Sequence, residues 1–249
     1  MISGLQANGA GSGHSNDLKK QICRHLEKFV TTQRLTRMRQ VLDKRTRYVT
    51  VVLEDIYQPH NAAAVLRSCE CFGVQDVYAV EGRNTFDISS KISRKAHQWL
   101  TLHTFKQAEA GDESCFKALK NKGYKIATLT PEAETRLDQL PLNLPLAFVF
   151  GTEKEGVSAL ARNESDFQVQ VPMAGFSESF NVSVTVAITL YETMKRLRMP
   201  EIESGFPLSL TSAEKEAIWY VWLKNTVKKS QLLEQEFLQN IKRASNPGK

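Results

Sequence analysis

The sequence lacks the motifs that mark the commonest cofactor and metal sites. No G-x-G-x-x-G segment follows a strand pattern, and G-x-x-x-x-G-K-[S/T], H-E-x-x-H and G-x-S-x-G are all absent. Ordinary dinucleotide, P-loop, zinc-protease and nucleophile-elbow sites therefore lose their main support. The five histidines show no metal-ligand spacing. We expect a protein that works without a metal.

Cysteines and long apolar runs are also scarce. The chain has four cysteines, and no two of them are spaced as Cys-x-x-Cys. Cys69 and Cys71 are two apart in an expected helix, so they point in different directions and could hardly share a metal. We interpret the thiols as reduced, which predicts a cytoplasmic protein. No run approaches the roughly 20 apolar residues of a membrane span, and neither an anchor nor a secretory signal is expected.

The net charge of +6 is unevenly placed. Residues 17–47 contain ten cations and three anions, about +7, so the rest of the chain sums to about −1. A basic appendage on a near-neutral body is typical of a protein that binds a polyanion. The alternative is a solvated helix surface without a ligand.

Alternating strand and helix patterns predict an α/β fold with a mostly parallel sheet. Residues 48–53 are apolar and β-branched, as in the first strand of a buried sheet. In the basic segment, one amphipathic helix is predicted over 17–30, and a second carries Leu35, Met38 and Leu42 on its apolar stripe. Further strand patterns lie at 77–80, 125–129, 146–150 and 168–171, with helical patterns at 62–72 and 114–122.

The C-terminal segment follows a break at Gly205 and Pro207. Thr211 and Glu214 have the spacing of a capping box, which predicts a long helix to about Asn240. Two tryptophans on its apolar face favour packing over stacking on bases. We therefore expect a disordered tail (1–16), a basic helical extension (17–47), an α/β domain (48–198) and a linker with a long helix (199–249).

Three separated segments carry the residues best suited to chemistry. Near residue 60, Asn61 can cap an alanine-rich helix that holds Arg67 almost two turns inside it. Gly151 follows an apolar strand, where a glycine allows a close backbone approach or a positive φ. Residues 182–186 alternate with β-branched side chains, which alone is typical of a strand. Without further information, a capped helix and ordinary turns would explain these features.

In this order and spacing, the segments 61–73, 150–156 and 171–184 resemble the signature segments of the SpoU/TrmH branch of the SPOUT RNA methyltransferases. The resemblance extends over roughly 48–198. It implies the SPOUT alpha/beta knot fold, with a mostly parallel sheet flanked by helices, a deep C-terminal trefoil knot and short helical extensions at both ends. It also implies a homodimer, and it makes Asn181 the start of a helix to about Arg196.

The resemblance implies roles for individual residues. Arg67 would lie at the ribose hydroxyl, often in the partner subunit's cofactor site, and Glu153 near the reacting centre. Many relatives have leucine where this chain has Phe180. The implied catalytic residues are Arg67, Asn61, Glu153, Ser179 and Asn181. The residues implied to bind S-adenosylmethionine are Thr128, Gly151, Thr152, Glu153, Lys154, Glu155, Val171, Met173 and Phe180.

The implied reaction transfers a methyl group from S-adenosylmethionine to an RNA ribose 2′-hydroxyl. The short basic flanks resemble the tRNA branch of the family, which predicts guanosine 18 of the tRNA D-loop as the target. An rRNA methyltransferase and a non-catalytic RNA-binding protein on the same scaffold are the alternatives. Because an arginine is a poor base, Arg67 would act either as a neutral base in a special site or as an electrostatic clamp. The expected RNA-binding residues are Arg34, Arg37, Arg39, Lys44 and Arg45.

Overall fold

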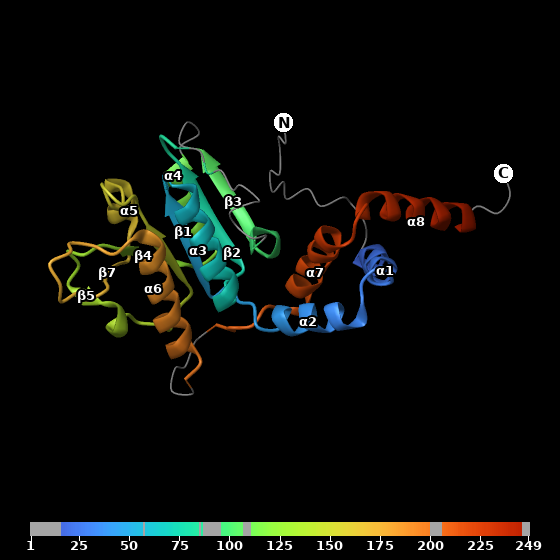
Figure 1. The fold of residues 1–249 in the computed structure, drawn as a ribbon, viewed down its shortest axis with the longest axis horizontal. Helices are drawn as coiled ribbons and strands as arrows, with labels where there is room; N and C mark the ends of the chain where they lie inside the picture. Colours follow the sequence, from blue (N-terminus) through green and yellow to red (C-terminus); the bar gives the residue numbers. More distant parts are fainter. Residues whose placement is uncertain are drawn as a thin grey trace. The chain divides into compact units, whose positions relative to one another are not determined.

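The computed structural model describes residues 16–245, except 57, 85, 87–95, 107–110 and 200–205. The chain divides into two compact units, shown in Figure 1. The helical unit joins the N-terminal segment up to Arg45 with the C-terminal segment from Leu210, and the sheet unit spans Thr46–Ser209. The two flanks, expected as separate extensions, thus form one unit. The expected disordered tail lies outside the described residues, apart from Asn16.

A seven-stranded sheet forms the centre of the sheet unit, in the order β3-β2-β1-β6-β4-β7-β5. Each of the pairings between neighbouring strands is parallel, so the predicted parallel sheet is confirmed. In the middle of the sheet, Val51 of β1 aligns with Val77 of β2 and with Phe148 of β6. The strands are β1 (Val49–Glu54), β2 (Asp76–Glu81), β3 (Thr101–Lys106), β4 (Lys125–Leu129), β5 (Thr135–Arg136), β6 (Leu146–Phe150) and β7 (Phe167–Gln170).

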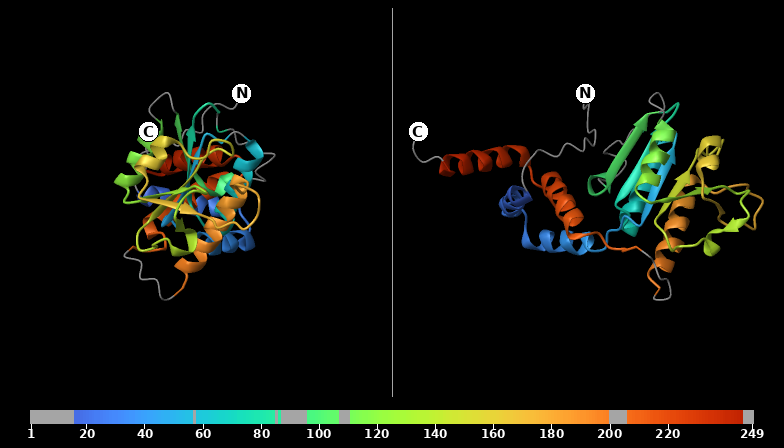
Figure 2. Two further views of the ribbon diagram at one scale, coloured as in Figure 1. Left: turned by 90° about the vertical axis from the view of Figure 1, so that its left-hand side faces the viewer. Right: turned by 180° about the vertical axis from the view of Figure 1, so that it is seen from behind.

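Helices cover both faces of the sheet because its central strands are apolar on both sides. Val51 and Leu53 of β1 pack in one cluster with α3 and α6, whereas Val52 packs in a second cluster with Phe116 of α4. Figure 1 shows α3 and α6 side by side on one face, and the right-hand view of Figure 2 shows α4 on the other. These helices are α3 (Pro59–Phe72), α4 (Gly111–Asn121), α5 (Ala159–Glu164) and α6 (Val182–Leu197), with 3-10 turns η1 (Ala96–Trp99) and η3 (Leu137–Gln139).

The sequence pattern predicts both ends of five strands to within one residue: β1, β2, β4, β6 and β7. It also predicts α3 and α4, but places the start of each three residues too late. It misses β3, β5 and α5. Strand β3 is at the sheet edge and is only partly buried, so its side chains do not follow a buried-strand pattern. Strand β5 has two residues and α5 has six, which is too short for a periodic pattern to be recognised.

Helix α3 begins at Pro59, two residues before the expected cap. Gln58 is the N-cap residue and makes no side-chain cap bond. Proline fits at the first helical position because its missing N–H would have no helical partner there. Asn61 lies inside the first turn and is only 2% exposed. The expectation that Asn61 caps this helix is therefore wrong, and its amide is available for other bonds.

Helix α6 begins directly after Asn181, as the family resemblance implies. The Asn181 Oδ1 atom accepts a hydrogen bond from the Ser183 backbone N–H at 2.9 Å, which caps the helix. Val182, Val186 and Leu190 are buried on one side of the helix. The strand suggested by the period-two pattern of residues 182–186 is therefore wrong, and the helix is confirmed.

A buried charge cluster lies at the start of β2. The Asp76 carboxylate accepts from Arg47 Nε at 3.0 Å, and His103 Nε2 is 3.8 Å from the same oxygen. The His103 ring stacks on Tyr78, with the ring centroids 4.4 Å apart. Burial alone would raise the pKa of Asp76, but His103 and Arg47 outweigh it and hold the pKa below its ordinary value. The cluster therefore stabilises this corner of the sheet while Asp76 is ionised.

The helical unit packs around two tryptophans. Trp222 is 1% exposed, and the Arg45 guanidinium lies 5.4 Å from its ring centroid. Trp219 donates from Nε1 to Glu27 Oε1 at 2.9 Å. The expectation that these rings serve packing is confirmed. The helices of this unit are α1 (Asn16–Glu27), α2 (Thr32–Leu42), α7 (Ser212–Thr226) and α8 (Ser230–Ser245).

The prediction of a single long C-terminal helix is wrong, although the predicted start of the helix is confirmed. Thr211 and Glu214 form the predicted capping box at the beginning of α7. The chain then breaks after Thr226, and Lys229 has a φ of +58° before α8 begins at Ser230. Neither glycine nor proline marks this break in the sequence. Within the described ranges, no helix is long and apolar enough to cross a membrane.

Candidate active site

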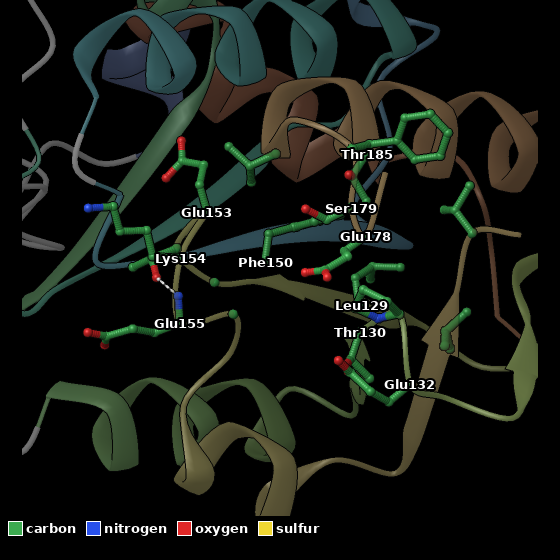
Figure 3. A pocket seen from close by; sticks show the side chains of 18 of the residues that line it. Leu129, Thr130, Glu132, Phe150, Glu153, Lys154, Glu155, Glu178, Ser179 and Thr185 are labelled. Atoms are coloured by element: carbon green, nitrogen blue, oxygen red, sulfur yellow. Dashed lines mark hydrogen bonds between the residues drawn. The ribbon is translucent and has the colours of Figure 1, made fainter. Parts of the chain in front are cut away.

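A cavity of about 270 Å³ opens at the carboxyl ends of β4, β6 and β7, beside the start of α6. Parallel sheets commonly bind ligands at this edge, where successive loops meet. Figure 3 shows residues 153–155 on one side of the cavity, with Leu129, Thr130 and Ser179 on the other. The lining residues are Leu129, Thr130, Pro131, Glu132, Phe150, Gly151, Thr152, Glu153, Lys154, Glu155, Gly156, Arg162, Val169, Val171, Met173, Glu178, Ser179, Phe180, Val182 and Thr185.

The loop after β6 is a tight turn that only glycine permits at its base. The backbone N–H and C=O groups of Thr152 and Gly156 pair with each other at 3.0 Å. A Cβ atom on Gly151 would lie 1.9 Å from the Gly156 carbonyl oxygen, which is impossible without moving the backbone. Gly156 itself has a φ of +68°. A glycine is thus required at 151 because of the chain's own backbone, and the close approach to a ligand stays a prediction.

A short chain of hydrogen bonds joins the three segments. Asn181 Nδ2 donates to Asn61 Oδ1 at 3.2 Å, and Asn61 Nδ2 donates to Glu153 Oε1. Asn61 Nδ2 is also 3.2 Å from Gln58 Oε1. These bonds satisfy the buried amide of Asn61, and through them Asn61 positions the pocket residue Glu153 and the cap residue Asn181.

The pocket combines an apolar floor with an acidic rim. Side chains such as Phe150, Val169 and Val171 provide the floor. The charged lining residues are four carboxylates and two cations: Glu132, Glu153, Glu155, Glu178, Lys154 and Arg162. A hydrogen bond from Thr130 holds the pKa of Glu132 below its ordinary value, so this carboxylate is ionised at neutral pH. Such a lining suits a ligand with a flat apolar ring and a positive charge.

Most of the predicted cofactor residues line this pocket: Gly151, Thr152, Glu153, Lys154, Glu155, Val171, Met173, Phe180 and the predicted catalytic residue Ser179. Thr128 does not. It is fully buried, and its Oγ1 atom lies 3.0 Å from Ser165 Oγ. Leu129, the last residue of β4, and Thr130, the first residue after it, line the pocket instead. Thr128 is therefore withdrawn from the cofactor site.

Arg67 lies apart from the pocket within one chain. It is exposed on α3 and is absent from the lining residues. Asn61 and Asn181 also do not line the pocket, but they are bonded to Glu153 directly or in series. The structure thus brings together every predicted catalytic residue except Arg67.

Several lining residues are not predicted from the sequence, notably Glu132, Arg162 and Glu178. Glu132 follows β4, Arg162 belongs to α5, and Glu178 belongs to the loop before α6. The carboxyl ends of parallel strands would have indicated the first of these. No pattern indicated Arg162, because α5 itself is not predicted. Among the described residues, no group of three or more His, Cys, Asp and Glu side chains could hold a metal ion.

The basic segment presents four of its five predicted cations to solvent. Arg34, Arg37 and Lys44 are exposed, and Arg39 is exposed while pairing with Glu27 at 2.7 Å. Arg45 is 1% exposed, with its guanidinium packed over a tryptophan. A buried guanidinium cannot contact a phosphate at the surface. The prediction that Arg45 binds RNA is therefore corrected: it is a packing residue.

Residues 48–191 match the model of the SpoU rRNA Methylase family. The chain belongs to this family. The tRNA (guanosine(18)-2′-O)-methyltransferase of Borreliella burgdorferi is 36% identical to this SpoU family member over 84% of this chain and 93% of the relative. The enzyme of the same name from Thermus thermophilus is 32% identical over 67% of this chain and 84% of the relative.

Solved structures support the same family assignment. The A. aeolicus TrmH/SpoU tRNA modifying enzyme is 27% identical to this SpoU family member, with a TM-score of 0.69 over 82% of this chain and 99% of that one. The SpoU methyltransferase AviRb of Streptomyces viridochromogenes, crystallised with AdoMet, is 18% identical, with a TM-score of 0.54 over 64% of each chain. The second likeness shows the fold alone.

Proposed function

We propose that this SpoU family protein transfers a methyl group from S-adenosylmethionine to the 2′-hydroxyl of guanosine 18 in the D-loop of tRNA. The observation that carries the proposal is the bonded chain Asn181–Asn61–Glu153, which joins three separate segments beside an acidic pocket. The choice of tRNA rests on the Borreliella burgdorferi relative, which is similar over nearly its whole length. Ribosomal RNA, which the family name mentions, is the second candidate.

The pocket residues fit S-adenosylmethionine. Val171, Met173 and Phe180 would hold the adenine and ribose, and the carboxylates of the rim suit a sulfonium and an ammonium group. Bound S-adenosylmethionine supplies a methyl group already activated by the positive sulfur. The protein then has to place a ribose hydroxyl in line with that methyl group and assist loss of its proton. Placement alone contributes several kcal/mol, on the order of 7 for a well-aligned pair.

Arg67 would complete the site from a second copy of the chain. Apolar side chains of α6 are exposed where it lies beside α3: Val184 is 43% exposed, Tyr191 is 58% exposed, and the ring centroids of Tyr191 and Phe72 are 6.4 Å apart. We propose that two copies cover these faces in a homodimer. Arg67, on the same α3 helix, would then reach the pocket of the partner subunit.

Arg67 would act as an electrostatic clamp. Its side chain is exposed on α3 within one chain, and a planar guanidinium offers several N–H donors to an oxygen that gains negative charge. A guanidinium beside the ribose 2′-oxygen would stabilise the negative charge that develops as the hydroxyl loses its proton. Glu153 would be held in place by Asn61 while the substrate is bound. Removing one such donor typically lowers turnover by about 10²- to 10³-fold.

Two finer features follow from the family assignment and belong to the same proposal. We infer that the sheet unit contains a deep trefoil knot, formed where the loops after β6 and β7 pass each other. Knots are rare and do not follow from chain pattern alone. We also infer a cytoplasmic location, where tRNA is the available substrate.

The helical unit would supply the remaining RNA contacts. Arg34, Arg37 and Lys44 are exposed on or near α2, which suits backbone phosphates rather than bases. Replacing Arg34 and Arg37 with alanine should weaken tRNA binding and reduce the salt slope by about 0.7 to 0.9 for each lost phosphate contact. Arg45→Lys serves as a contrast, because it alters packing at Trp222 without removing a surface charge. An unchanged slope for the surface variants would remove α2 from the footprint.

The proposed function is tested by nucleoside mass spectrometry. Bulk tRNA and rRNA are incubated with the protein and S-adenosylmethionine, and we expect 2′-O-methylguanosine to rise in tRNA only. Arg67→Ala should lower product formation by about 10²- to 10³-fold while calorimetry finds unchanged S-adenosylmethionine affinity. Arg136→Ala, an exposed arginine outside the pocket lining, is the control and should keep turnover. RNA binding without any methylated nucleoside would favour a non-catalytic RNA-binding protein instead.

A further inference from the structure

Phe176 is the most exposed of the large apolar side chains in the described part of the chain. Its relative exposure is 109%, which equals that of a residue in an isolated peptide. A single exposed phenylalanine elsewhere would need no explanation. This one lies between Met173 and Glu178, two residues that line the candidate pocket. The next aromatic ring along the loop, Phe180, also lines the pocket and is 40% exposed.

The charge of this loop limits what it can bind. Residues 171–181 contain no lysine or arginine and one carboxylate, Glu178. The rest of the pocket lining adds three carboxylates, Glu132, Glu153 and Glu155, and two cations, Lys154 and Arg162. The loop itself offers a phosphate no cation, so it is unsuited to the backbone contacts that dominate nonspecific RNA binding. An RNA offers one other broad surface that needs no charge, which is the face of an unpaired base.

An aromatic ring at this place is well positioned for such a base. The proposed reaction requires a ribose 2′-oxygen within roughly 3 to 3.5 Å of the methyl group, at a pocket that this loop borders. The bases attached to that ribose and to its neighbours must then lie within a few ångströms of the pocket rim. Base stacking on aromatic side chains is the common way in which proteins hold unpaired RNA bases.

We propose that Phe176 stacks on an unpaired nucleobase of the RNA, at or next to the nucleotide that is methylated. The proposal rests on the proposed function for the nature of the substrate. Phe176 is thus a substrate-positioning residue, and the aromatic ring rather than a charge supplies its affinity. Its full exposure before RNA binds also means that truncation removes no contact on which the fold depends.

The test compares Phe176→Ala, Phe176→Trp and the control Phe206→Ala, which truncates an exposed phenylalanine outside the pocket lining. The probe is an unmodified tRNA transcript with a guanosine in its D-loop. The dissociation constant of the RNA is measured by fluorescence anisotropy with S-adenosylhomocysteine present, so that it does not depend on turnover. Phe176→Ala should weaken binding by about 5- to 150-fold, the loss expected for one base stack.

Three further readouts separate stacking from a structural role. Phe176→Trp should restore RNA affinity, because tryptophan also stacks on bases. The melting temperature and the S-adenosylmethionine affinity of Phe176→Ala should match those of the parent protein. A transcript that is abasic at the stacked position should lose nothing more when Phe176 is replaced, since the two changes remove the same contact.

The outcomes distinguish this inference from the proposed function. If the parent protein binds the transcript but forms no 2′-O-methylguanosine, the proposed function fails, and the anisotropy result still decides the role of Phe176. Equal RNA affinity of Phe176→Ala and the parent protein would overturn the inference. A drop in S-adenosylmethionine affinity, or a change in oligomeric state on replacing Phe176, would also overturn it, because the ring would then pack on the cofactor or on a second copy.

Discussion

Asn61 is the residue whose replacement tests the convergence of the three segments most sharply. Its side chain is 2% exposed, donates to the Glu153 carboxylate and accepts from Asn181 Nδ2 at 3.2 Å. Asn61→Ala removes both bonds together. Each hydrogen bond contributes about 1 kcal/mol net to the free energy of unfolding. For the bond to Glu153 we take a low value, because that carboxylate is exposed and water can replace the lost donor. We expect a loss of about 2 kcal/mol in the free energy of unfolding.

The loss should appear as a lower melting temperature, by about 4 to 8 °C for a chain of this length. A matched control is Asn163→Ala, because Asn163 is an exposed residue of α5 and such surface changes stay within about 0.5 kcal/mol. A double-mutant cycle with Asn181→Ala isolates the bond between the two asparagines. Urea unfolding should give a coupling of about 1 kcal/mol.

Two results would refute this reasoning. The first is additivity of Asn61→Ala and Asn181→Ala within about 0.3 to 0.5 kcal/mol, which would mean that the two side chains do not interact. The second is a cost for Asn61→Ala no larger than that of Asn163→Ala. Either result would mean that Asn61 does not link the loop after β6 to the start of α6, and that these bonds do not hold the pocket together.

Three other changes have clear expected outcomes. Gly151→Ala should weaken S-adenosylmethionine binding at least about tenfold in calorimetry, because the added methyl group would meet the backbone of the same loop. The matched control Gly175→Ala has room for a methyl group and should bind S-adenosylmethionine normally. Equal affinities of the two variants would contradict the tight turn. Tyr191→Glu should convert the proposed dimer into a monomer in light scattering and abolish methylation, and a dimer of unchanged mass would exclude the α3–α6 face. Burial would raise the pKa of Asp76, but His103 and the Arg47 guanidinium outweigh burial and lower it. The stabilisation by Asp76 is therefore complete above the ordinary carboxyl pKa of about 4 and is lost below it, as pH falls through the lowered pKa. Asp76→Asn should therefore flatten the fall of the melting temperature below about pH 4, and an unchanged acid profile would assign the loss to other groups.

Local pattern was sufficient for much of the fold. Strands such as Leu146–Phe150 are continuous apolar runs, and a run buried on both faces has few alternatives in a parallel sheet. The period-two alternation at residues 182–186 pointed the wrong way, because β-branched side chains can be buried along a helix when tertiary packing supplies the free energy. The family resemblance gave the correct helix at this place. The break at Lys229 had no glycine or proline to announce it.

The candidate site shows where reasoning from sequence stops. The need for a glycine at 151 could be anticipated from local pattern, whereas the helix start at Asn181 came from the family resemblance. The bonds of Asn61 join residues 92 and 120 positions away, so no local pattern contains them. Arg45 illustrates the same limit, because its burial depends on Trp222, which lies in a distant helix. Charge alone therefore could not show that the Arg45 guanidinium is buried.

The central claim is that this pocket directs a methyl group to a ribose oxygen of tRNA. The most direct measurement uses S-adenosylmethionine with a deuterated methyl group, tRNA as the acceptor, and mass spectrometry of the released nucleosides. We predict deuterium-labelled 2′-O-methylguanosine, with the label on the ribose and none on a base. The Arg67→Ala protein should form it about 10²- to 10³-fold more slowly. Label on a base, or no label in tRNA from a protein that binds S-adenosylmethionine, would contradict the account.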